Sequence, residues 1–396
     1  MNRNPKQVIV VGAGIIGLAV ARAYLLRFPD SRVKVIEKEP EIAKHQSSHN
    51  SGVIHSGVYY APGSLKAQFC VQGHRLMLEF CENHAIPYKR CGKLIVAVDE
   101  TELPRLQALF ERGLANGIKN MQLMDSAQMR EVEPYLVGIA GLYIPHTSVV
   151  DFSKVANAYA QDIQMAGGEI ILSSEVKHIV HTNGKARVIT EHDEYEADWV
   201  VTCAGLYSDR ISEAGNELRV IPFRGSYYVL SARASDLVRS LIYPVPNPQF
   251  PFLGVHFTRT IGDNVLVGPN AVLAMAREGY RRRDIDVREL FSTFTYAGFI
   301  KFSRRYWQTG LIELIRDLSK RLYLKNIQQY IPDIELEDLL PGPSGVRAQT
   351  LGVAGNLLDD FQIKQNGPVI HVQNAPSPAA TSSLVIGEYI VDQLKQ

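Results

Sequence analysis

The chain has few cysteines and no long apolar run. Its four cysteines, Cys70, Cys81, Cys91 and Cys203, form no Cys-x-x-Cys pair, which argues against a disulfide framework and against a metal centre with cysteine ligands. We therefore expect reduced thiols in a cytoplasmic protein with no metal site. No apolar run approaches the roughly 20 residues that cross a bilayer. Residues 1–7 are too short and too polar for a signal peptide.

An excess of charge of one sign is also missing. The chain carries 42 Lys and Arg against 41 Asp and Glu, a net charge of +1, so no general attraction to nucleic acid is expected. Neither a Gly-x-Ser-x-Gly turn nor a Walker phosphate loop occurs, which disfavours acyl transfer and phosphoryl transfer. With 46% hydrophobic and 21% charged residues in 396, the composition is that of a globular protein large enough for two domains.

A glycine-rich turn near the start of the chain is the strongest motif present. The apolar run Val8–Val11 leads into Gly-Ala-Gly-Ile-Ile-Gly at 12–17, and a second apolar run, Val33–Ile36, ends at Glu37. A strand, a tight turn, a helix and a second strand closed by an acid form a dinucleotide-binding unit, in which the amino end of the helix holds the pyrophosphate. The acid is placed to accept hydrogen bonds from a ribose diol and disfavours a 2′-phosphate, which leaves FAD or NAD. The expected ligands here are Gly12, Ala13, Gly14, Ile15, Gly17, Glu37 and Lys38.

The rest of the chain alternates between patterns typical of helices and of strands. Helices are expected at 64–84, 100–117, 126–133, 151–166, 285–330 and from about 379. Strands are expected at 94–98, 169–172, 175–180, 198–203, 219–230, 256–258, 264–268, from 342 and at 368–373, with a hairpin at 187–197. The strands within 219–272 are punctuated by proline and are candidates for the wall of a substrate site.

Several longer runs carry a resemblance to a known family. They lie at 47–60, 62–66, 203–209, 223–228, 254–258, 268–271, 345–349 and 374–381. The His-Asn-Ser-Gly-Val-Ile-His-Ser-Gly run and the Arg-Ala-Gln triplet are the most specific of them. Through these runs the chain resembles the FAD-dependent D-amino-acid oxidase-like superfamily, and within it the L-2-hydroxyglutarate oxidase/dehydrogenase family, over nearly its whole length. One departure is Ser226, where many relatives have an acid.

The resemblance implies an α/β fold, in which a Rossmann-like FAD-binding domain is interleaved with an antiparallel-sheet substrate domain and a helical insertion. The FAD-binding domain would be discontinuous, at 1–90, 145–215 and 340–396. The substrate domain would take 91–144 and 216–339, and its helical segment 277–330 is a candidate for membrane contact.

FAD is the cofactor that the resemblance implies, and further stretches would bind it. The loop 47–57 is rich in small hydrogen-bonding residues and would lie along the pyrophosphate and the flavin. Val176 would pair its backbone with adenine, and the amino end of the last helix would face the pyrimidine edge of the flavin. The residues expected to bind FAD are Ser47, Ser48, Asn50, Ser51, Gly52, Val176, Cys203, Ala204, Gly205, Pro376, Ala379, Ala380 and Thr381. Covalent attachment through His49 or His55 is left open.

The implied reaction is oxidation of L-2-hydroxyglutarate to 2-oxoglutarate, in which a hydride passes from C2 to flavin N5. A neutral imidazole suits removal of the hydroxyl proton near pH 7, so His256 is the preferred base. His55 would contact flavin or substrate, or act as the base instead. The fork of an arginine fits a carboxylate, and Arg347 is the main candidate for that contact. Further candidates for substrate contact are Arg224, Arg259, Lys66, Tyr60 and Tyr228.

The sequence does not decide which molecule accepts the electrons or which substrate is oxidised. A quinone, oxygen or a soluble carrier can take electrons from reduced flavin. Segment 277–325 holds 12 Lys and Arg against 6 Asp and Glu, beside many apolar side chains. Segment 281–330 is therefore a candidate for peripheral contact with the inner face of the cell membrane, and a helical subdomain or a contact between copies is the alternative. Alternative substrates are another small 2-hydroxy acid, an amino acid, a secondary amine or glycerol 3-phosphate. A non-catalytic flavoprotein that binds a partner is a further alternative.

Overall fold

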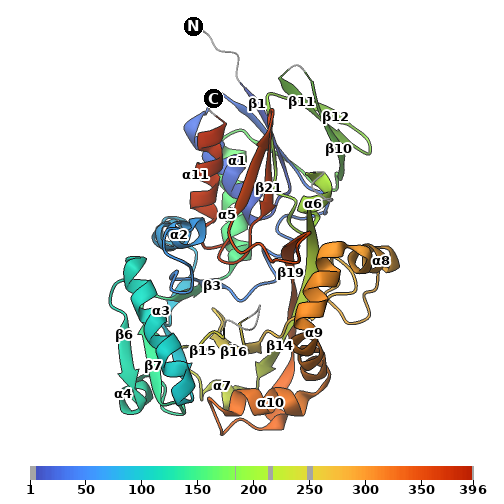
Figure 1. The fold of residues 1–396 in the computed structure, drawn as a ribbon. Coiled ribbons are helices and arrows are strands. Elements are labelled where there is room, and N and C mark those ends of the chain that lie inside the picture. Colours follow the sequence, from blue (N-terminus) through green and yellow to red (C-terminus); the bar gives the residue numbers. More distant parts are fainter. Residues whose placement is uncertain (1–5, 183, 213–216, 248–252, 395–396) are drawn as a thin grey trace.

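A mostly parallel sheet forms the upper half of the molecule in Figure 1. The computed structural model describes residues 6–182, 184–212, 217–247 and 253–394. In these residues the sheet has the strand order β20-β21-β13-β1-β2-β9, and only the β20–β21 pair is antiparallel. The strands are β1 (Gln7–Val11), β2 (Arg32–Ile36), β9 (Glu169–Ile171), β13 (Trp199–Thr202), β20 (Gln362–Asn366) and β21 (Val369–Asn374). A central β1 with parallel neighbours on both sides is the arrangement that binds dinucleotides at its carboxyl edge.

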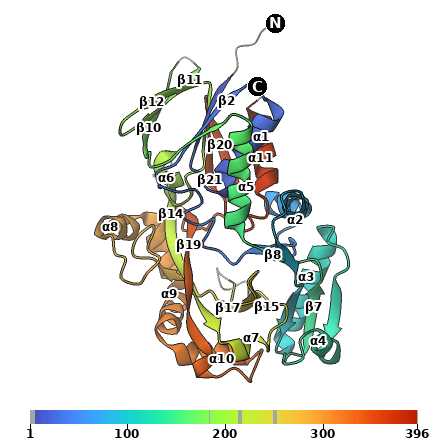
Figure 2. The same ribbon diagram turned by 180° about the vertical axis from the view of Figure 1, so that it is seen from behind.

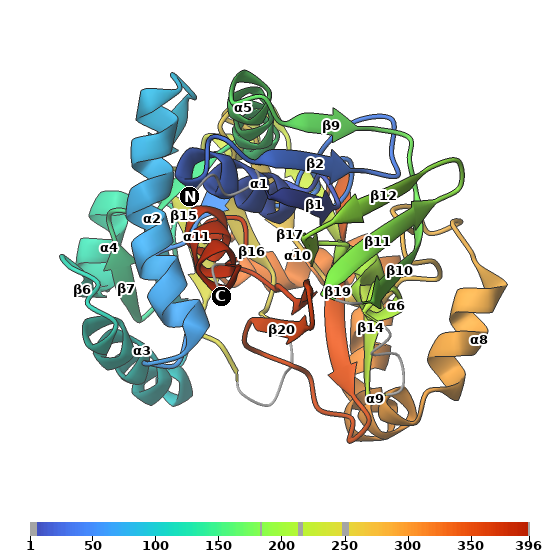
Figure 3. The ribbon, with the colours of Figure 1, turned by 90° about the horizontal axis from the view of Figure 1, so that it is seen from above.

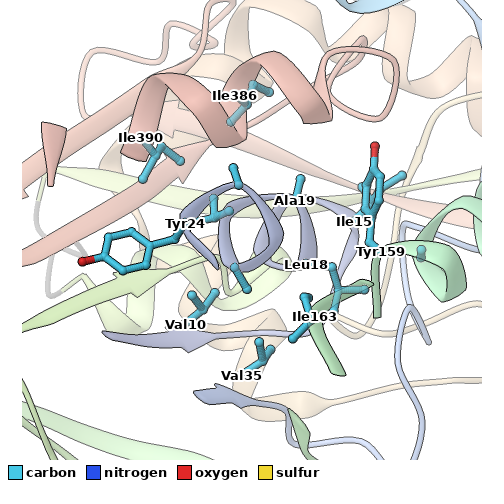
Figure 4. Close-up of a cluster of buried hydrophobic side chains, with 14 of the residues drawn as sticks. Val10, Ile15, Leu18, Ala19, Tyr24, Val35, Tyr159, Ile163, Ile386 and Ile390 are labelled. Carbon is cyan, nitrogen blue, oxygen red and sulfur yellow. The ribbon is translucent and has the colours of Figure 1, made fainter. Parts of the chain in front are cut away.

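Helix α1 (Ile15–Arg27) lies at the centre of the core that covers this sheet. Figure 4 shows Leu18 and Ala19 of α1 between Val10 and Val35 of the sheet and Ile386 of the last helix. The neighbouring helices are α5 (Phe152–Met165) and α11 (Ser383–Gln393). Because α1 packs against the sheet and both helices, nine of its thirteen residues are buried, and its sequence is apolar apart from Arg22 and Arg27.

The lower half of the molecule is built on a sheet of nine strands within the described residues. Its pairs are antiparallel except for the parallel pair β5–β15. The long strands β14 and β19 pair over most of their length and connect the two halves. The strands are β5 (Lys93–Ala97), β6 (Gln122–Asp125), β7 (Ala140–Ile144), β14 (Leu218–Leu230), β15 (Leu241–Pro244), β16 (His256–Arg259), β17 (Val265–Gly268), β18 (Val272–Leu273) and β19 (Leu339–Gly352).

Two smaller sheets and the remaining helices surround these halves (Figures 2 and 3). One small sheet consists of β10 (Val176–Thr182), β11 (Lys185–Thr190) and β12 (Glu194–Ala197), and the other of β3 (Val53–Ile54), β4 (Tyr88–Arg90) and β8 (Ser148–Val150). One flank carries α2 (Leu65–Asn83), α3 (Leu103–Ala115) and α4 (Ser126–Val132). The other flank and the base carry α8 (Val287–Thr295), α9 (Ala297–Leu318) and α10 (Lys320–Gln328). Short helical turns are η1 (Glu100–Glu102), η2 (Gly205–Tyr207), α6 (Ser208–Ile211), α7 (Ala232–Ser235) and η3 (Leu336–Asp338). No described helix combines the length and the apolar character needed to cross a bilayer.

The α/β fold class with a Rossmann-type sheet is confirmed, and several details differ from expectation. The last helix begins at Ser383 rather than near 379, because residues 376–382 form hydrogen-bonded turns. The segment 285–330 is three helices, and Tyr306 kinks the middle one. Several strands of two to five residues were not expected, since such short strands show too little alternation to be recognised. The expected domain boundary at 215–216 and both chain ends lie outside the described residues.

Candidate active site

A cavity of about 990 Å³ is lined by residues of both large sheets. One end lies at the carboxyl ends of β1, β2 and β13, and the other at the strands β16 and β19 of the nine-stranded sheet. Its volume is at the upper limit of roughly 300–1,000 Å³ that small-molecule sites occupy. It can therefore take a ligand of dinucleotide size.

The turn between β1 and α1 leaves open backbone at the first end. Gly12 has φ +103°, and a Cβ there would stand 2.5 Å from the carbonyl oxygen of Cys203. A Cβ on Gly17 would stand 1.9 Å from the carbonyl oxygen of Gly12. The N–H of Ile15 donates to Ser47 Oγ (2.9 Å), while the amino end of α1 opens to the cavity. A cradle of bare backbone at a helix amino end fits a pyrophosphate.

Glu37 follows β2 and lines the cavity beside this cradle. Its Oε2 accepts the N–H of Ala13 (2.7 Å) and its Oε1 accepts the N–H of Glu39 (3.0 Å). A carboxylate oxygen can accept more than one hydrogen bond, so Glu37 keeps capacity for a ribose diol. Lys38 also lines the cavity, but its Nζ is engaged by Glu39 and Glu278, each at 2.6 Å.

The cavity brings together most of the residues expected to bind FAD. Those that line it are Gly12, Gly14, Ile15, Glu37, Lys38, Ser47, Asn50, Ser51, Val176, Cys203, Ala204, Gly205, Pro376, Ala379, Ala380 and Thr381. Four expected residues do not line the cavity, namely Ala13, Gly17, Ser48 and Gly52. Of these, Ser48 is exposed and donates to backbone of its own turn, so its contribution is to the loop rather than to a ligand.

Thr381 ties the last segment of the chain to the loop that crosses the cavity. Its Oγ1 donates to the carbonyl of Val53 (3.3 Å) and accepts the N–H of His55 (3.0 Å). Residues 374–381 all line the cavity. One hydroxyl therefore sets the position of His55 relative to the carboxyl-terminal turn.

His256 lies on β16 at the second end of the cavity. Its ring stacks on Tyr243 with ring centres 3.9 Å apart, and its Nδ1 lies 3.1 Å from the carbonyl oxygen of Gly254. A carbonyl only accepts, so Nδ1 carries the proton and Nε2 is left as an acceptor. Burial, with smaller contributions from Arg347 and Lys93, lowers the pKa of His256 to about 3. The side chain is therefore a neutral imidazole at physiological pH.

His55 lines the same cavity from the loop after β3. Its Nε2 lies 3.4 Å from Ser377 Oγ, and its buried Nδ1 has no hydrogen-bond partner in the described part of the chain. Burial and the neighbouring Lys93 and His256 lower its pKa well below the ordinary value. A buried ring nitrogen without a partner is costly, which is the expected state of a group that meets a ligand.

Two cationic candidates reach the cavity. Arg347, on β19, lines it and is near enough to His256 to lower the pKa of that imidazole. Lys66, at the start of α2, is 6% exposed and its Nζ lies 2.7 Å from Asp359 Oδ1. The Nζ of Lys66 also lies 5.3 Å from the ring centre of Tyr60, which lines the cavity too. Arg347, Lys66 and Tyr60 therefore line the same cavity.

Three residues expected to contact the substrate, Arg224, Tyr228 and Arg259, do not line this cavity. Arg224 is buried outside the cavity, with Nη2 3.0 Å from Asp317 Oδ2 on α9. Tyr228 packs its ring on Tyr323 of α10, and Arg259 donates to backbone carbonyls of 235 and 238. Gly225 and Tyr227 line the cavity instead, because neighbours on a strand point to opposite faces.

The sequence did not single out four tyrosines that line the cavity, Tyr59, Tyr207, Tyr227 and Tyr243. The hydroxyl of Tyr59 is buried without a partner among the described residues. Gln46 was also missed, and its Oε1 accepts the N–H of Ala348 (3.1 Å) across the cavity wall. Adjacent tyrosines occur at 59–60 and 227–228, so the pattern identified the pairs but not which member faces the ligand.

An FAD-dependent redox enzyme is the class of protein that this fold and cavity define. The family model described as FAD dependent oxidoreductase matches residues 7–393, and the chain belongs to that family. It is 45% identical over 385 residues to the L-2-hydroxyglutarate dehydrogenase of Indibacter alkaliphilus, covering 96% of each chain. It is 45% identical to the mitochondrial L-2-hydroxyglutarate dehydrogenase of Homo sapiens, covering 98% of this chain and 88% of that one.

Solved structures share the architecture. The chain aligns with the FAD-bound L-alpha-glycerophosphate oxidase of Mycoplasma pneumoniae with a TM-score of 0.79 and 24% identity, covering 100% of this chain and 96% of that one. At this identity the likeness establishes the fold, and FAD is the cofactor of the family to which the chain belongs. The bare backbone at Gly12 and Gly17 and the carboxylate of Glu37 fit that cofactor.

Proposed function

We propose that this protein oxidises L-2-hydroxyglutarate to 2-oxoglutarate. The observation that carries the proposal is the meeting of a neutral histidine, His256, and an arginine, Arg347, at the end of the cavity remote from the phosphate cradle. The relatives that match nearly the whole chain at 45% identity bear the name L-2-hydroxyglutarate dehydrogenase. An acid–base group beside a carboxylate-binding fork is what a 2-hydroxy acid requires.

Each of these residues has one task in the proposed reaction. Arg347 binds the carboxylate next to C2 and orients the substrate, because its planar fork matches two carboxylate oxygens. His256 accepts the hydroxyl proton at Nε2, which its Nδ1 bond to Gly254 leaves unprotonated. When bound, FAD supplies the acceptor for the hydride that leaves C2. Substrate carboxylates near Arg347 offset the positive field on His256, which raises its pKa towards the range in which it holds a proton.

Anaerobic mixing of the purified yellow protein with a panel of acids tests this reaction. We expect L-2-hydroxyglutarate to bleach the flavin absorbance, and one molecule of 2-oxoglutarate to form for each flavin that is reduced. D-2-hydroxyglutarate, L-glutamate, a secondary amine and glycerol 3-phosphate serve as the comparison set. Faster bleaching by any of these than by L-2-hydroxyglutarate would replace the proposed substrate, and no bleaching by any would favour a non-catalytic flavoprotein.

We further propose that α8, α9 and α10 place the protein on an anionic membrane surface, where a quinone takes the electrons. Large apolar side chains on these helices are exposed, among them Phe291 at 72%, Trp307 at 60% and Leu318 at 67%. The segment 277–325 around them has twice as many basic as acidic residues. Exposed apolar and basic side chains on helices suit an interfacial position.

Sedimentation with liposomes tests this second proposal. The protein pellets with vesicles that contain anionic lipid at low salt and is released when salt is raised, whereas zwitterionic vesicles leave it in solution. The variant Phe291→Ser/Trp307→Ser/Leu318→Ser stays in the supernatant and keeps its flavin. Wild-type protein that stays in solution with anionic vesicles would contradict the proposal, and reoxidation by oxygen as fast as by a soluble quinone would make oxygen the acceptor.

A further inference from the structure

Lys93 is a buried cation beside the substrate end of the cavity. It is the first residue of β5, and its side chain is 1% exposed. Its Nζ lies 4.1 Å from the ring centre of Tyr243 and 5.1 Å from that of Tyr59. Both rings line the cavity, so the ammonium stands directly behind the wall that a ligand would touch.

The other deeply buried cations differ from Lys93 in having carboxylate partners. Lys66 pairs with Asp359, Arg224 with Asp317, and Arg277 with Asp209. No ion pair joins Lys93 to a carboxylate of the described residues, and the neighbours that act on its charge are the thiols of Cys70 and Cys91. A buried charge without a counter-ion lowers the stability of the folded state, so a purely structural role does not account for a lysine here.

The field of Lys93 reaches the substrate end of the cavity. It contributes to the lowered pKa values of both His55 and His256. Arg347 also acts on His256, so two positive charges converge on this end. Of the cavity-lining carboxylates, Glu37, Glu175 and Glu278 lie with the residues of the nucleotide end, and Asp359 is paired with Lys66. Near Lys93, the Tyr59 hydroxyl and His55 Nδ1 are buried without partners among the described residues.

We propose that Lys93 is the second positive charge of the substrate site and selects hydroxy acids with a carboxylate at both ends. This inference rests on the proposed function. Arg347 holds the carboxylate next to C2, and Lys93, together with the hydroxyl of Tyr59, stabilises the distal one. The distal carboxylate supplies the counter-ion that the protein does not provide. Lys93 is thus a specificity-determining residue and not the base.

Comparison of two acids of equal chain length tests this role. L-2-hydroxyglutarate and L-2-hydroxypentanoate share the reacting centre, and only the first has a distal carboxylate. Lys93→Met should lower kcat/KM for L-2-hydroxyglutarate at least thirtyfold and that for L-2-hydroxypentanoate less than threefold. The Kd of inert glutarate, followed by the flavin spectrum of the oxidised holoenzyme, should rise by a similar factor, while the Kd of pentanoate should not. Lys89→Met makes the same chemical change at an exposed position outside the cavity and should leave all four constants unchanged.

Stability provides an independent readout. Because the Lys93→Met substitution removes an uncompensated charge from the interior, the variant should bind FAD and unfold at or above the temperature of the wild type. A variant that loses FAD, fails to fold or unfolds at a lower temperature would overturn the inference, as would equal losses on both acids or no loss on either. If the wild type itself does not oxidise L-2-hydroxyglutarate, the proposed function fails. If the wild type does oxidise L-2-hydroxyglutarate, and K93M has the same ratio of kcat/KM for the two acids as the wild type, the role of Lys93 is rejected while the proposed function stands.

Discussion

Arg347 and His256 reach the same end of the cavity from different strands, β19 and β16. A single residue change on either strand therefore alters one task of the proposed site while the nucleotide end, built on β1 and β2, stays intact. This separation allows flavin content and turnover to be measured as independent properties of one variant.

Arg347→Lys tests the fork at the carboxylate. We expect the variant to retain FAD and to lose kcat/KM on L-2-hydroxyglutarate by about a hundredfold, because a point charge cannot bind two carboxylate oxygens as a planar guanidinium does. Steady-state kinetics and the flavin absorbance of the purified protein measure both properties. Arg259→Lys, outside the cavity, serves as the matched control, and wild-type kinetics in the Arg347 variant would reject the assignment.

His256 makes stability depend on pH in a definite direction. Burial lowers its pKa to about 3 in the folded state, whereas an unfolded histidine titrates near 6.5. The unfolded chain therefore binds the extra proton as the pH falls below about 6.5, so the folded state loses stability there, on the order of 2 kcal/mol between pH 6.5 and 5 from this group. His256→Gln should show a smaller loss over that interval in urea titrations of the apoprotein. An equal loss in wild type and variant would show that the imidazole is not buried in neutral form, and His192→Gln on an exposed loop controls for the substitution.

Single residues also show which parts of the site the sequence can and cannot predict. The sequence motifs pointed to Arg347, His256 and His55, and the structure places all three in one cavity. The sequence also pointed to Tyr228 and Arg224 on β14, although their neighbours Tyr227 and Gly225 face the cavity. A shift of one residue reverses the face of a strand, and both faces of β14 carry polar side chains. Lys93 was overlooked because a lysine at the start of an apolar run reads as the exposed end of a strand.

At the scale of elements, the packing of α1 against β1 was the most predictable part of the fold. The turn between β1 and α1 requires glycine at fixed positions, and these glycines can be recognised in the sequence. Gly17, for example, has no room for a Cβ beside the Gly12 carbonyl. The short strands β3, β4, β8 and β18 have two or three residues each, and they form only because distant segments supply their partners. Long-range pairing of that kind leaves no periodic pattern in the sequence.

Gly17→Ala tests the turn as a unit. The added methyl would stand 1.9 Å from a backbone oxygen, so α1 must move away from β1 and the phosphate cradle must widen. We expect at least tenfold weaker FAD binding, measured by flavin fluorescence on titration of the apoprotein. Gly310→Ala in α9, where a Cβ meets no atom within 4 Å, is the control and should bind FAD as the wild type does. Unchanged affinity in the Gly17 variant would contradict the role given to this helix end.

At the scale of the whole molecule, the cavity has walls from both large sheets. A ligand that contacts both walls binds only the folded arrangement and stabilises it by mass action. We expect FAD at 100 times its Kd to stabilise the apoprotein by about 2.7 kcal/mol. This gain is read as a rise of the unfolding temperature. ADP, which can reach only the nucleotide end, should raise it less at the same concentration, and an equal rise would show that the flavin half makes no contribution.

The hydrogen bonds that join Thr381 to Val53 and His55 have a consequence for biosynthesis. The cavity is lined by the turn after β1 at Gly12 and by residues 374–381. While a ribosome still encloses residues 374–381, the Gly12 turn can form but this part of the cavity wall is missing. We therefore expect flavin to be bound only after residues 374–381 have left the ribosome, and we expect fragments that end before residue 374 to be colourless.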